Sequence, residues 1–207
     1  MPKSVVITGA NRGIGLAMTQ LFLEKHYQVY ALCRKTSPEL SYSGANVIEG
    51  VEITNQQGLS KMVEALADVT IDTLICNAGI LRDESLSDLN LDTIREQFEV
   101  NALAPLNVVE QLQDNLSKGS KVAMITSRMG SIADNGSGGR YGYRMSKAAL
   151  NAASMSLSKD LAYRDIAVGI YHPGYVQTDM VNNRGDIPAS EAASRLVKLI
   201  EDLTMAE

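Results

Sequence analysis

The chain has 207 residues, a net charge of −5 at pH 7 and an isoelectric point near 5.1. This length suffices for a substantial core, so we expect residues 1–207 to form a single domain. The acidic balance disfavours nucleic acid and anionic membranes as main partners, and no apolar run reaches the roughly 18 residues of a membrane span. The first residues enter a strand at once, so we expect no secretory leader, and two isolated cysteines suggest neither a metal site nor a disulfide framework. We therefore expect a cytoplasmic protein.

A buried strand and a glycine-rich turn open the chain. Residues 3–8 are a β-branched run, and residues 16–24 have helical periodicity. Between them, residues 8–15 read Thr-Gly-Ala-Asn-Arg-Gly-Ile-Gly. Glycines let the backbone approach a ligand, and the N–H groups and dipole of a helix N-terminus favour a pyrophosphate. The lysine of a nucleotide-hydrolysing loop is absent, so the turn predicts dinucleotide binding.

The end of the second strand, residues 27–33, bears on the choice of cofactor. An acid at this point binds the ribose 2′-hydroxyl of NAD, whereas an arginine accommodates the 2′-phosphate of NADP. Here Arg34 and Lys35 follow the strand, and no acid comes before Glu39. Arg12 in the glycine turn offers a second cation. We therefore expect NADP(H) rather than NAD(H).

The remaining elements alternate between strands and helices. We expect strands over 46–53, 70–76, 121–127 and 166–171, and helices over 54–67, 90–116, 140–163 and about 190–203, the first opened by Thr54 and the last by Ser190. This alternation predicts an α/β fold: one Rossmann-type, doubly wound parallel sheet of order 3-2-1-4-5-6 with helices on both faces. Cys33 and Cys76 would then lie about 9.6 Å apart, two strand spacings, and remain free thiols.

Pro105 lies inside the predicted helix 90–116. A proline has no N–H to donate to the carbonyl four residues earlier, which belongs to Asn101. The helix should kink there and leave that carbonyl free to bind water or another donor. A tolerated kink without any role is the alternative, and the sequence leaves both open.

Tyr143 and Lys147 are four residues apart and share one helix face. A nearby cation lowers the pKa of a phenol, which is ordinarily about 10, so such a pair can transfer a proton near neutral pH. The spacing alone is common on surface helices and decides nothing. Ser127 lies where strand 121–127 ends, at the ligand-binding edge of the sheet, and no G-x-S-x-G turn surrounds it.

Taken in order, these motifs resemble the short-chain dehydrogenase/reductase family. The matching residues are Thr8-Gly9-x-x-x-Gly13-Ile14-Gly15, Asn77-Ala78-Gly79, Asn101, Ser127, Tyr143-x-x-x-Lys147 and Pro173-Gly174-x-x-x-Thr178. The surroundings of Tyr143 and Ser127 are similar to NADPH-dependent carbonyl reductases, a branch that includes C-factor-like bacterial proteins.

The resemblance implies a role for each catalytic residue. Tyr143 would be the general acid of carbonyl reduction and the base of the reverse reaction. Lys147 would lower the pKa of Tyr143 and bind the nicotinamide ribose, and Ser127 would hydrogen-bond the substrate oxygen. Asn101 would hold a water that links Lys147 to solvent.

The resemblance also implies a cofactor site. Gly9, Asn11, Arg12, Gly13, Ile14 and Gly15 would surround the adenosine and pyrophosphate, and Arg34 would face the 2′-phosphate. Glu52 and Ile53 would contact the adenine, Asn77, Ala78 and Gly79 the nearer ribose, and Pro173, Gly174, Val176 and Thr178 the nicotinamide. No metal is implied.

Three features depart from the family pattern. Sixteen positions separate Ser127 from Tyr143, a few more than usual, and Glu52 replaces a commoner aspartate. No seventh strand follows residues 166–171, so that strand becomes a sheet edge, which implies a truncated chain or cover from another chain or segment.

The short 178–188 loop predicts an open pocket with apolar lining from Ile80, Leu81, Met129 and Met180.

The leading hypothesis is therefore an NADPH-dependent reductase of aldehydes or ketones. A regulatory or signalling protein that binds NADP(H) with little turnover is one alternative, and an NAD-linked alcohol dehydrogenase is another. Helices 90–116 and 140–163 often form the dimer face in this family, so a homodimer stays open.

Overall fold

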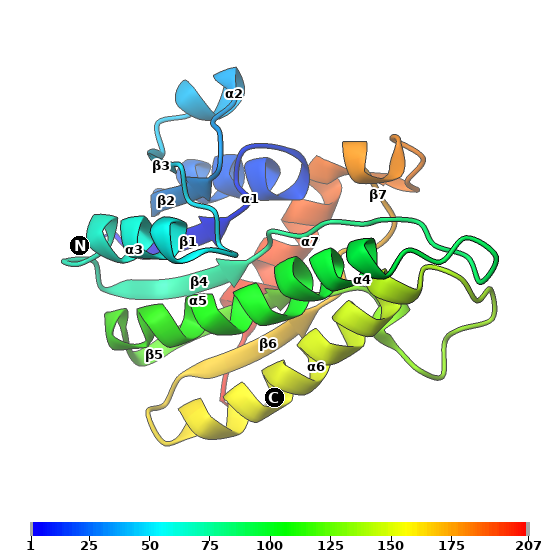
Figure 1. Cartoon of the computed structure of the whole chain (residues 1–207). Helices are drawn as coiled ribbons and strands as arrows, with labels where there is room; N and C mark the ends of the chain where they lie inside the picture. The colour runs from blue at the N-terminus through cyan, green and yellow to red at the C-terminus, as the bar shows by residue number, and fades with distance from the viewer. Residues whose placement is uncertain (1, 206–207) are drawn as a thin grey trace.

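A six-stranded parallel sheet forms the centre of the computed structural model, which describes residues 2–205. Its order is β3-β2-β1-β4-β5-β6, as predicted (Figure 1). The strands are β1 Ser4–Thr8, β2 Gln28–Cys33, β3 Asn46–Glu49, β4 Ile71–Cys76, β5 Leu116–Ile125 and β6 Ala167–Tyr171. Within the described residues, no helix combines the length and apolar character needed to cross a membrane.

Helices cover both faces of the sheet and give it two hydrophobic cores (Figure 1). They are α1 Gly13–Glu24, α2 Pro38–Ser41, α3 Gln56–Ala65, α4 Leu91–Phe98, α5 Ala104–Leu112, α6 Tyr141–Ala162 and α7 Ala189–Asp202. Phe22 of α1 and Leu196 of α7 pack on one face, and Leu112 of α5 and Leu150 of α6 pack on the other. β1 lies between these layers with every residue buried, which explains its continuous apolar pattern.

The two cysteines are buried and free, as predicted. Cys33 ends β2 and Cys76 ends β4, so β1 separates them. They belong to the hydrophobic cores on opposite faces of the sheet, which keeps the two thiols apart.

The third strand is shorter than predicted, because Gly50 adopts a positive φ of 81° directly after it. Glu52 and Ile53 therefore lie beyond the strand rather than in it. The helix cap was also misplaced by one residue. The Asn55 side chain accepts a hydrogen bond of 2.8 Å from the Gly58 N–H, whereas the Thr54 hydroxyl donates to Glu52.

The predicted helix 90–116 is not continuous. A π-helical turn, η1 Glu99–Leu103, separates α4 from α5, and the Ala104 N–H donates to the carbonyl of Glu99, five residues earlier. The helix is thus interrupted by a π turn just before Pro105, while the predicted kink and the free Asn101 carbonyl stay predictions. The helix ends in a 3₁₀ turn, Gln113–Asn115, and β5 begins at once, five residues earlier than expected.

The segment before the last helix is more ordered than the expected loop. Val176–Gln177 (β7) and Ile187–Pro188 (β8) pair as a small parallel sheet. Helix α7 then begins at Ala189 with Pro188 as its N-cap residue. The predicted Ser190 cap is wrong because Ser190 already lies inside the helix.

Asn55→Ala should lower stability through the lost cap of α3. We expect about 1 kcal/mol, equivalent to a fall in Tm of roughly 3 °C, measured by thermal unfolding. Thr54→Ala is the matched control, since it leaves the cap intact, and should change Tm much less. Equal losses for both variants would contradict the assigned cap.

Candidate active site

A cleft of about 910 Å³ lies at the carboxyl ends of the strands. Every predicted cofactor residue lines it, from the glycine turn to the 173–178 segment, together with Ser127, Tyr143 and Lys147. The four apolar residues expected at the substrate end, Ile80, Leu81, Met129 and Met180, also line it. Asn101 is not part of the lining and lies fully buried. The structure thus brings into one cleft residues that are up to about 170 positions apart in the chain.

The glycine turn packs against the end of β4 with no room for side chains. A Cβ on Gly15 would lie 2.2 Å from the Gly9 carbonyl oxygen, and a Cβ on Gly9 would lie 2.9 Å from the Ala78 Cα. The Thr8 hydroxyl accepts hydrogen bonds from the backbone N–H groups of Asn77 and Ala78, at 3.0 and 3.1 Å. The Asn77 amide donates in return to the carbonyls of Thr8 and Gly9. These bonds fix the two strand ends that form the floor of the cleft.

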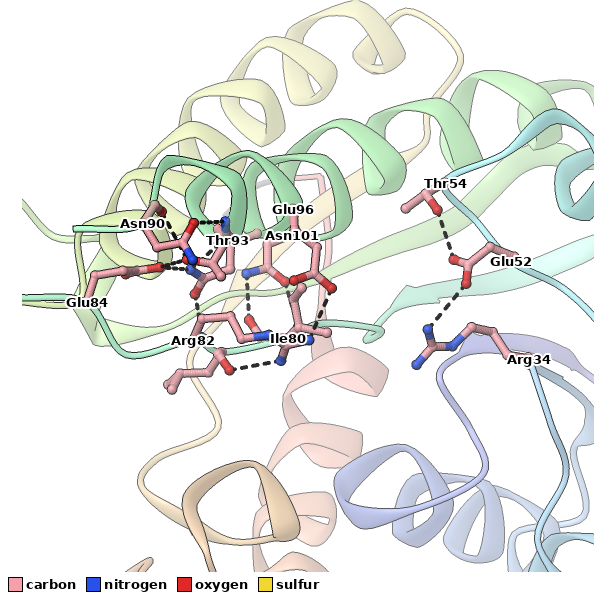
Figure 2. Close-up of polar contacts among 12 residues, drawn as sticks. Arg34, Glu52, Thr54, Ile80, Arg82, Glu84, Asn90, Thr93, Glu96 and Asn101 are labelled. Atoms are coloured by element: carbon pink, nitrogen blue, oxygen red, sulfur yellow. Dashed lines mark hydrogen bonds and ion pairs between the residues drawn. The ribbon is translucent and has the colours of Figure 1, made fainter. Parts of the chain in front are cut away.

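The cations expected near a 2′-phosphate each have a carboxylate partner. Arg34 lies 3.3 Å from Glu52, whose other oxygen accepts from Thr54 (Figure 2). Arg12 lies 3.6 Å from Asp179. Both arginine side chains are largely exposed, so these ion pairs are weak and exchangeable for a phosphate. Lys35 also lines the cleft beside them.

Tyr143 and Lys147 lie on the first turns of α6, both buried in the wall of the cleft. The Lys147 ammonium lies 5.9 Å from the Tyr143 ring centroid and donates to the Ile125 carbonyl at 2.9 Å. Burial lowers the pKa of Lys147 to about 8. Lys147 therefore loses much of its charge just above neutral pH.

Burial raises the pKa of Tyr143, opposed by a hydrogen bond to Ser127 and by the positive charge of Arg140. This is the opposite of the direction expected from a neighbouring lysine. Desolvation of the phenolate by burial outweighs both of these opposing effects. The phenol therefore stays protonated at neutral pH.

Ser127 and Tyr143 meet although sixteen positions separate them. Ser127 follows β5 and is the N-cap of a short 3₁₀ turn, Arg128–Gly130, where its hydroxyl accepts from the Met129 N–H at 3.1 Å. Gly130 then packs against the backbone of Lys147, where a Cβ would lie 2.8 Å from its carbonyl carbon. This close contact holds the serine turn against α6.

The Asn101 side chain fastens the π turn to the cleft wall. Its amide donates to the Ile80 carbonyl and accepts from the Ile80 N–H, both at 2.8 Å (Figure 2). It also donates to the Ser146 hydroxyl of α6 at 3.1 Å. Gly79 lies directly in front, where a Cβ would be 3.2 Å from the Asn101 oxygen and 3.7 Å from the Lys147 nitrogen. The polar ends of Asn101 and Lys147 thus both lie next to Gly79.

Residues 3–188 match the sequence profile of the family described as short chain dehydrogenase. The chain belongs to the short-chain dehydrogenase/reductase family. The 1-hydroxy-2-glutathionyl-2-methyl-3-butene dehydrogenase of Rhodococcus sp. strain AD45 is 34% identical over 208 residues, covering 98% of this chain and 92% of that relative. C-signal of Myxococcus xanthus is 41% identical over 136 residues, covering 64% of this chain and 82% of that relative.

Solved structures give the same assignment. A carbonyl reductase from Pseudomonas aeruginosa PAO1 in complex with NADP superposes with a TM-score of 0.87 at 30% identity, covering 100% of this chain and 94% of the other. The branch predicted from the motifs, with carbonyl reductases and C-factor-like proteins, is therefore confirmed.

Glu84 is a buried acid that the sequence did not indicate as part of the site. Glu84 accepts hydrogen bonds from the Thr93 hydroxyl at 2.9 Å, the Gln97 amide at 2.6 Å and the Gly142 backbone N–H at 3.2 Å. Figure 2 shows Glu84 beside Thr93 of α4. Its backbone carbonyl also accepts from the Arg140 N–H. Glu84 therefore fixes the start of the helix that carries Tyr143.

Glu84→Ala should destabilise the fold, because it removes a buried carboxylate that accepts three hydrogen bonds and leaves the Gly142 N–H without its acceptor. A loss of about 3 kcal/mol corresponds to a Tm lower by roughly 10 °C in thermal unfolding. Glu64→Ala, which removes an exposed acid from α3, is the control. If the two variants unfold at the same temperature, Glu84 does not have this role.

Proposed function

We propose that this protein is an NADPH-dependent oxidoreductase that reduces aldehyde or ketone carbonyls to alcohols, with Tyr143 as general acid. One observation carries the proposal: Ser127 and Tyr143 lie together in the cleft that the glycine turn also lines. Two hydroxyl groups are therefore available to one substrate oxygen, beside the region where a nicotinamide would lie.

The residues of the glycine turn fit a dinucleotide. Arg12, the N-cap residue of α1, makes no side-chain capping bond within the described residues, so the first N–H groups of α1 remain available to a phosphate. Gly13 has a positive φ of 54°, and Gly15 admits no side chain, which keeps the backbone open to a pyrophosphate. The absence of an acid directly after β2, with Arg34 and Lys35 there instead, favours NADP(H).

The chain's own residues supply the proton and the orientation. NADPH, when bound, supplies the hydride for the carbonyl carbon. Ser127 and Tyr143 both donate hydrogen bonds to the carbonyl oxygen, where negative charge develops. Tyr143 then transfers its proton to that oxygen, and its raised pKa suits an acid that must be protonated at neutral pH. In the direction of alcohol oxidation the same phenolate accepts the proton.

Lys147 is the group from which Tyr143 would regain its proton. Its pKa of about 8 makes the ammonium a suitable donor near neutral pH. Pro105 has no N–H for the Asn101 carbonyl, and this supports a water at that carbonyl as the path from Lys147 to solvent.

Tyr143→Phe should lower kcat/KM for NADPH-dependent carbonyl reduction by at least about 100-fold, because the acid is lost. The assay follows NADPH oxidation with a panel of aldehydes and ketones. Tyr163→Phe, at the exposed C-terminal end of the same helix, is the matched control and should keep the wild-type rate. A folded wild type that leaves NADPH unoxidised across the panel, or an active Tyr143→Phe, contradicts the proposal.

Arg34→Gln should weaken NADPH binding about tenfold and leave NADH binding nearly unchanged, because only NADPH carries the 2′-phosphate. Titration calorimetry with both cofactors measures this. Arg95→Gln removes an exposed arginine of α4 that has a similar acidic partner, and serves as control. Wild-type protein that binds NADH as tightly as NADPH would instead favour an NAD-linked alcohol dehydrogenase.

A regulatory protein is the second candidate, favoured by the 41% identity to C-signal over 64% of the chain. Calorimetric binding of NADPH with no turnover of any carbonyl would support this candidate. The intact pair of Ser127 and Tyr143 makes catalysis the better-supported function.

A further inference from the structure

A small hollow of about 90 Å³ adjoins the substrate end of the cleft. The hollow adjoins the substrate end of the cleft, because the two cavities share five lining residues: Leu81, Arg140, Tyr175, Met180 and Val181. Arg184 lines the hollow and not the cleft. Two arginines from distant parts of the chain therefore lie around one small space.

Arg140 is held at this place against its backbone preference. It adopts a left-handed conformation, φ 50° and ψ 46°, directly before α6, which is strained for a residue with a side chain. The hydrogen bond of 2.8 Å from its N–H to the Glu84 carbonyl stabilises that conformation. Its guanidinium donates through Nε to Asp83 at 2.6 Å, which orients the side chain. Its positive charge also acts to lower the pKa of the Tyr143 phenol.

The backbone on both sides of Arg184 is conformationally constrained. Asn182 and Asn183 before it are left-handed, with φ of 51° and 56°. A Cβ on Gly185 after it would lie 2.2 Å from the Gln177 nitrogen, so this turn packs tightly on β7. Within residues 2–205, the Arg184 guanidinium has no ion pair or hydrogen bond, unlike Arg140.

The charges at this end of the cleft do not balance. Arg82 is paired with Glu96 at 3.1 Å, as Figure 2 shows, and Arg140 is paired with Asp83. Arg184 lines the hollow as well and, among the described residues, has no ion-pair partner. An unpaired cation beside a substrate site, in a protein whose net charge is −5, favours an anionic ligand.

We propose that this hollow, lined by Arg140 and Arg184, binds a carboxylate at the far end of the substrate from its carbonyl. The inference rests on the proposed reductase function and narrows its substrate class to acidic carbonyl compounds. Arg184 is the primary partner, and Arg140 contributes its Nη2, since its Nε donates to Asp83 and its Nη1 to the Met129 sulfur. Asp83 competes with the ligand for Arg140, and its exposure to solvent keeps that competition weak.

The test compares kcat/KM with NADPH for ω-oxo carboxylates of increasing chain length and for the methyl ester of each. The acid should exceed its ester about tenfold at the best-fitting length, and added salt should reduce this ratio. Arg184→Gln should lower the ratio five- to tenfold, and Arg95→Gln should keep it. A ratio near one at every length, or a wild-type ratio in Arg184→Gln, overturns the proposal.

Asp83→Asn should change the ratio of kcat/KM for the acid to that for its ester in the direction opposite to Arg184→Gln. It removes the acid that competes for Arg140, so the ratio of acid to ester should rise. A fall in Asp83→Asn as well as in Arg184→Gln would show that disturbed geometry, and not charge, lowers the ratio, and would overturn the proposal.

A binding measurement separates this inference from the reductase proposal. Calorimetry compares hexanoate with methyl hexanoate on the complex with NADP⁺, in wild type and Arg184→Gln. Binding of the carboxylate that depends on Arg184, without turnover of any carbonyl, supports the hollow and contradicts the reductase proposal. Turnover of carbonyl compounds without any preference for the acid over its ester supports the reductase proposal and contradicts the carboxylate site in the hollow.

Discussion

The contact between the Glu84 carboxylate and the Gly142 N–H is the constraint on which the active-site geometry depends. It joins the segment after β4 to the first turn of α6, one residue before Tyr143. A buried carboxylate without a cationic partner is costly unless every oxygen accepts hydrogen bonds, and here three donors meet that condition. A helix N-terminus is favourable for such a charge, since its unpaired N–H groups point toward it. The phenol of Tyr143 is thereby placed by a network that touches neither substrate nor cofactor.

Burial sets the chemical character of the proton-transfer pair. A phenol and an ammonium in water would have pKa values near 10 and 10.5, and desolvation moves them in opposite directions, raising that of Tyr143 and lowering that of Lys147 to about 8. Lys147 then becomes the stronger acid of the two. This order suits a relay in which the lysine reprotonates the tyrosine, and it follows from packing against the sheet more than from the attraction between the two groups.

The glycine turn and the shared face of Tyr143 and Lys147 were predicted correctly, because each depends on neighbours within one turn. The sheet order was predicted from the alternation of strands and helices along the whole chain, which is typical of a doubly wound sheet. The end of β3 was missed because a single residue, Gly50, determines it by its φ value. Glu84 had no local signal at all, since its partners come from α4 and α6 and only the tertiary fold brings them to it. The sequence likewise contained Arg140 and Arg184, but nothing in their spacing indicated a shared hollow.

The π turn at Glu99–Leu103 has a consequence for how this helix tolerates insertions and deletions. A π turn is equivalent to one extra residue in an α-helix, and each residue turns the helix by about 100°. Deleting one residue there would restore a regular helix and leave the residues after it in their present orientation, so Val108 and Leu112 would stay buried. The same deletion within α5 would rotate every later residue of that helix by about 100° and turn Leu112 away from the sheet. A single-residue deletion that spares Asn101, whose side chain bonds Ile80, is therefore better tolerated in this turn than in α5.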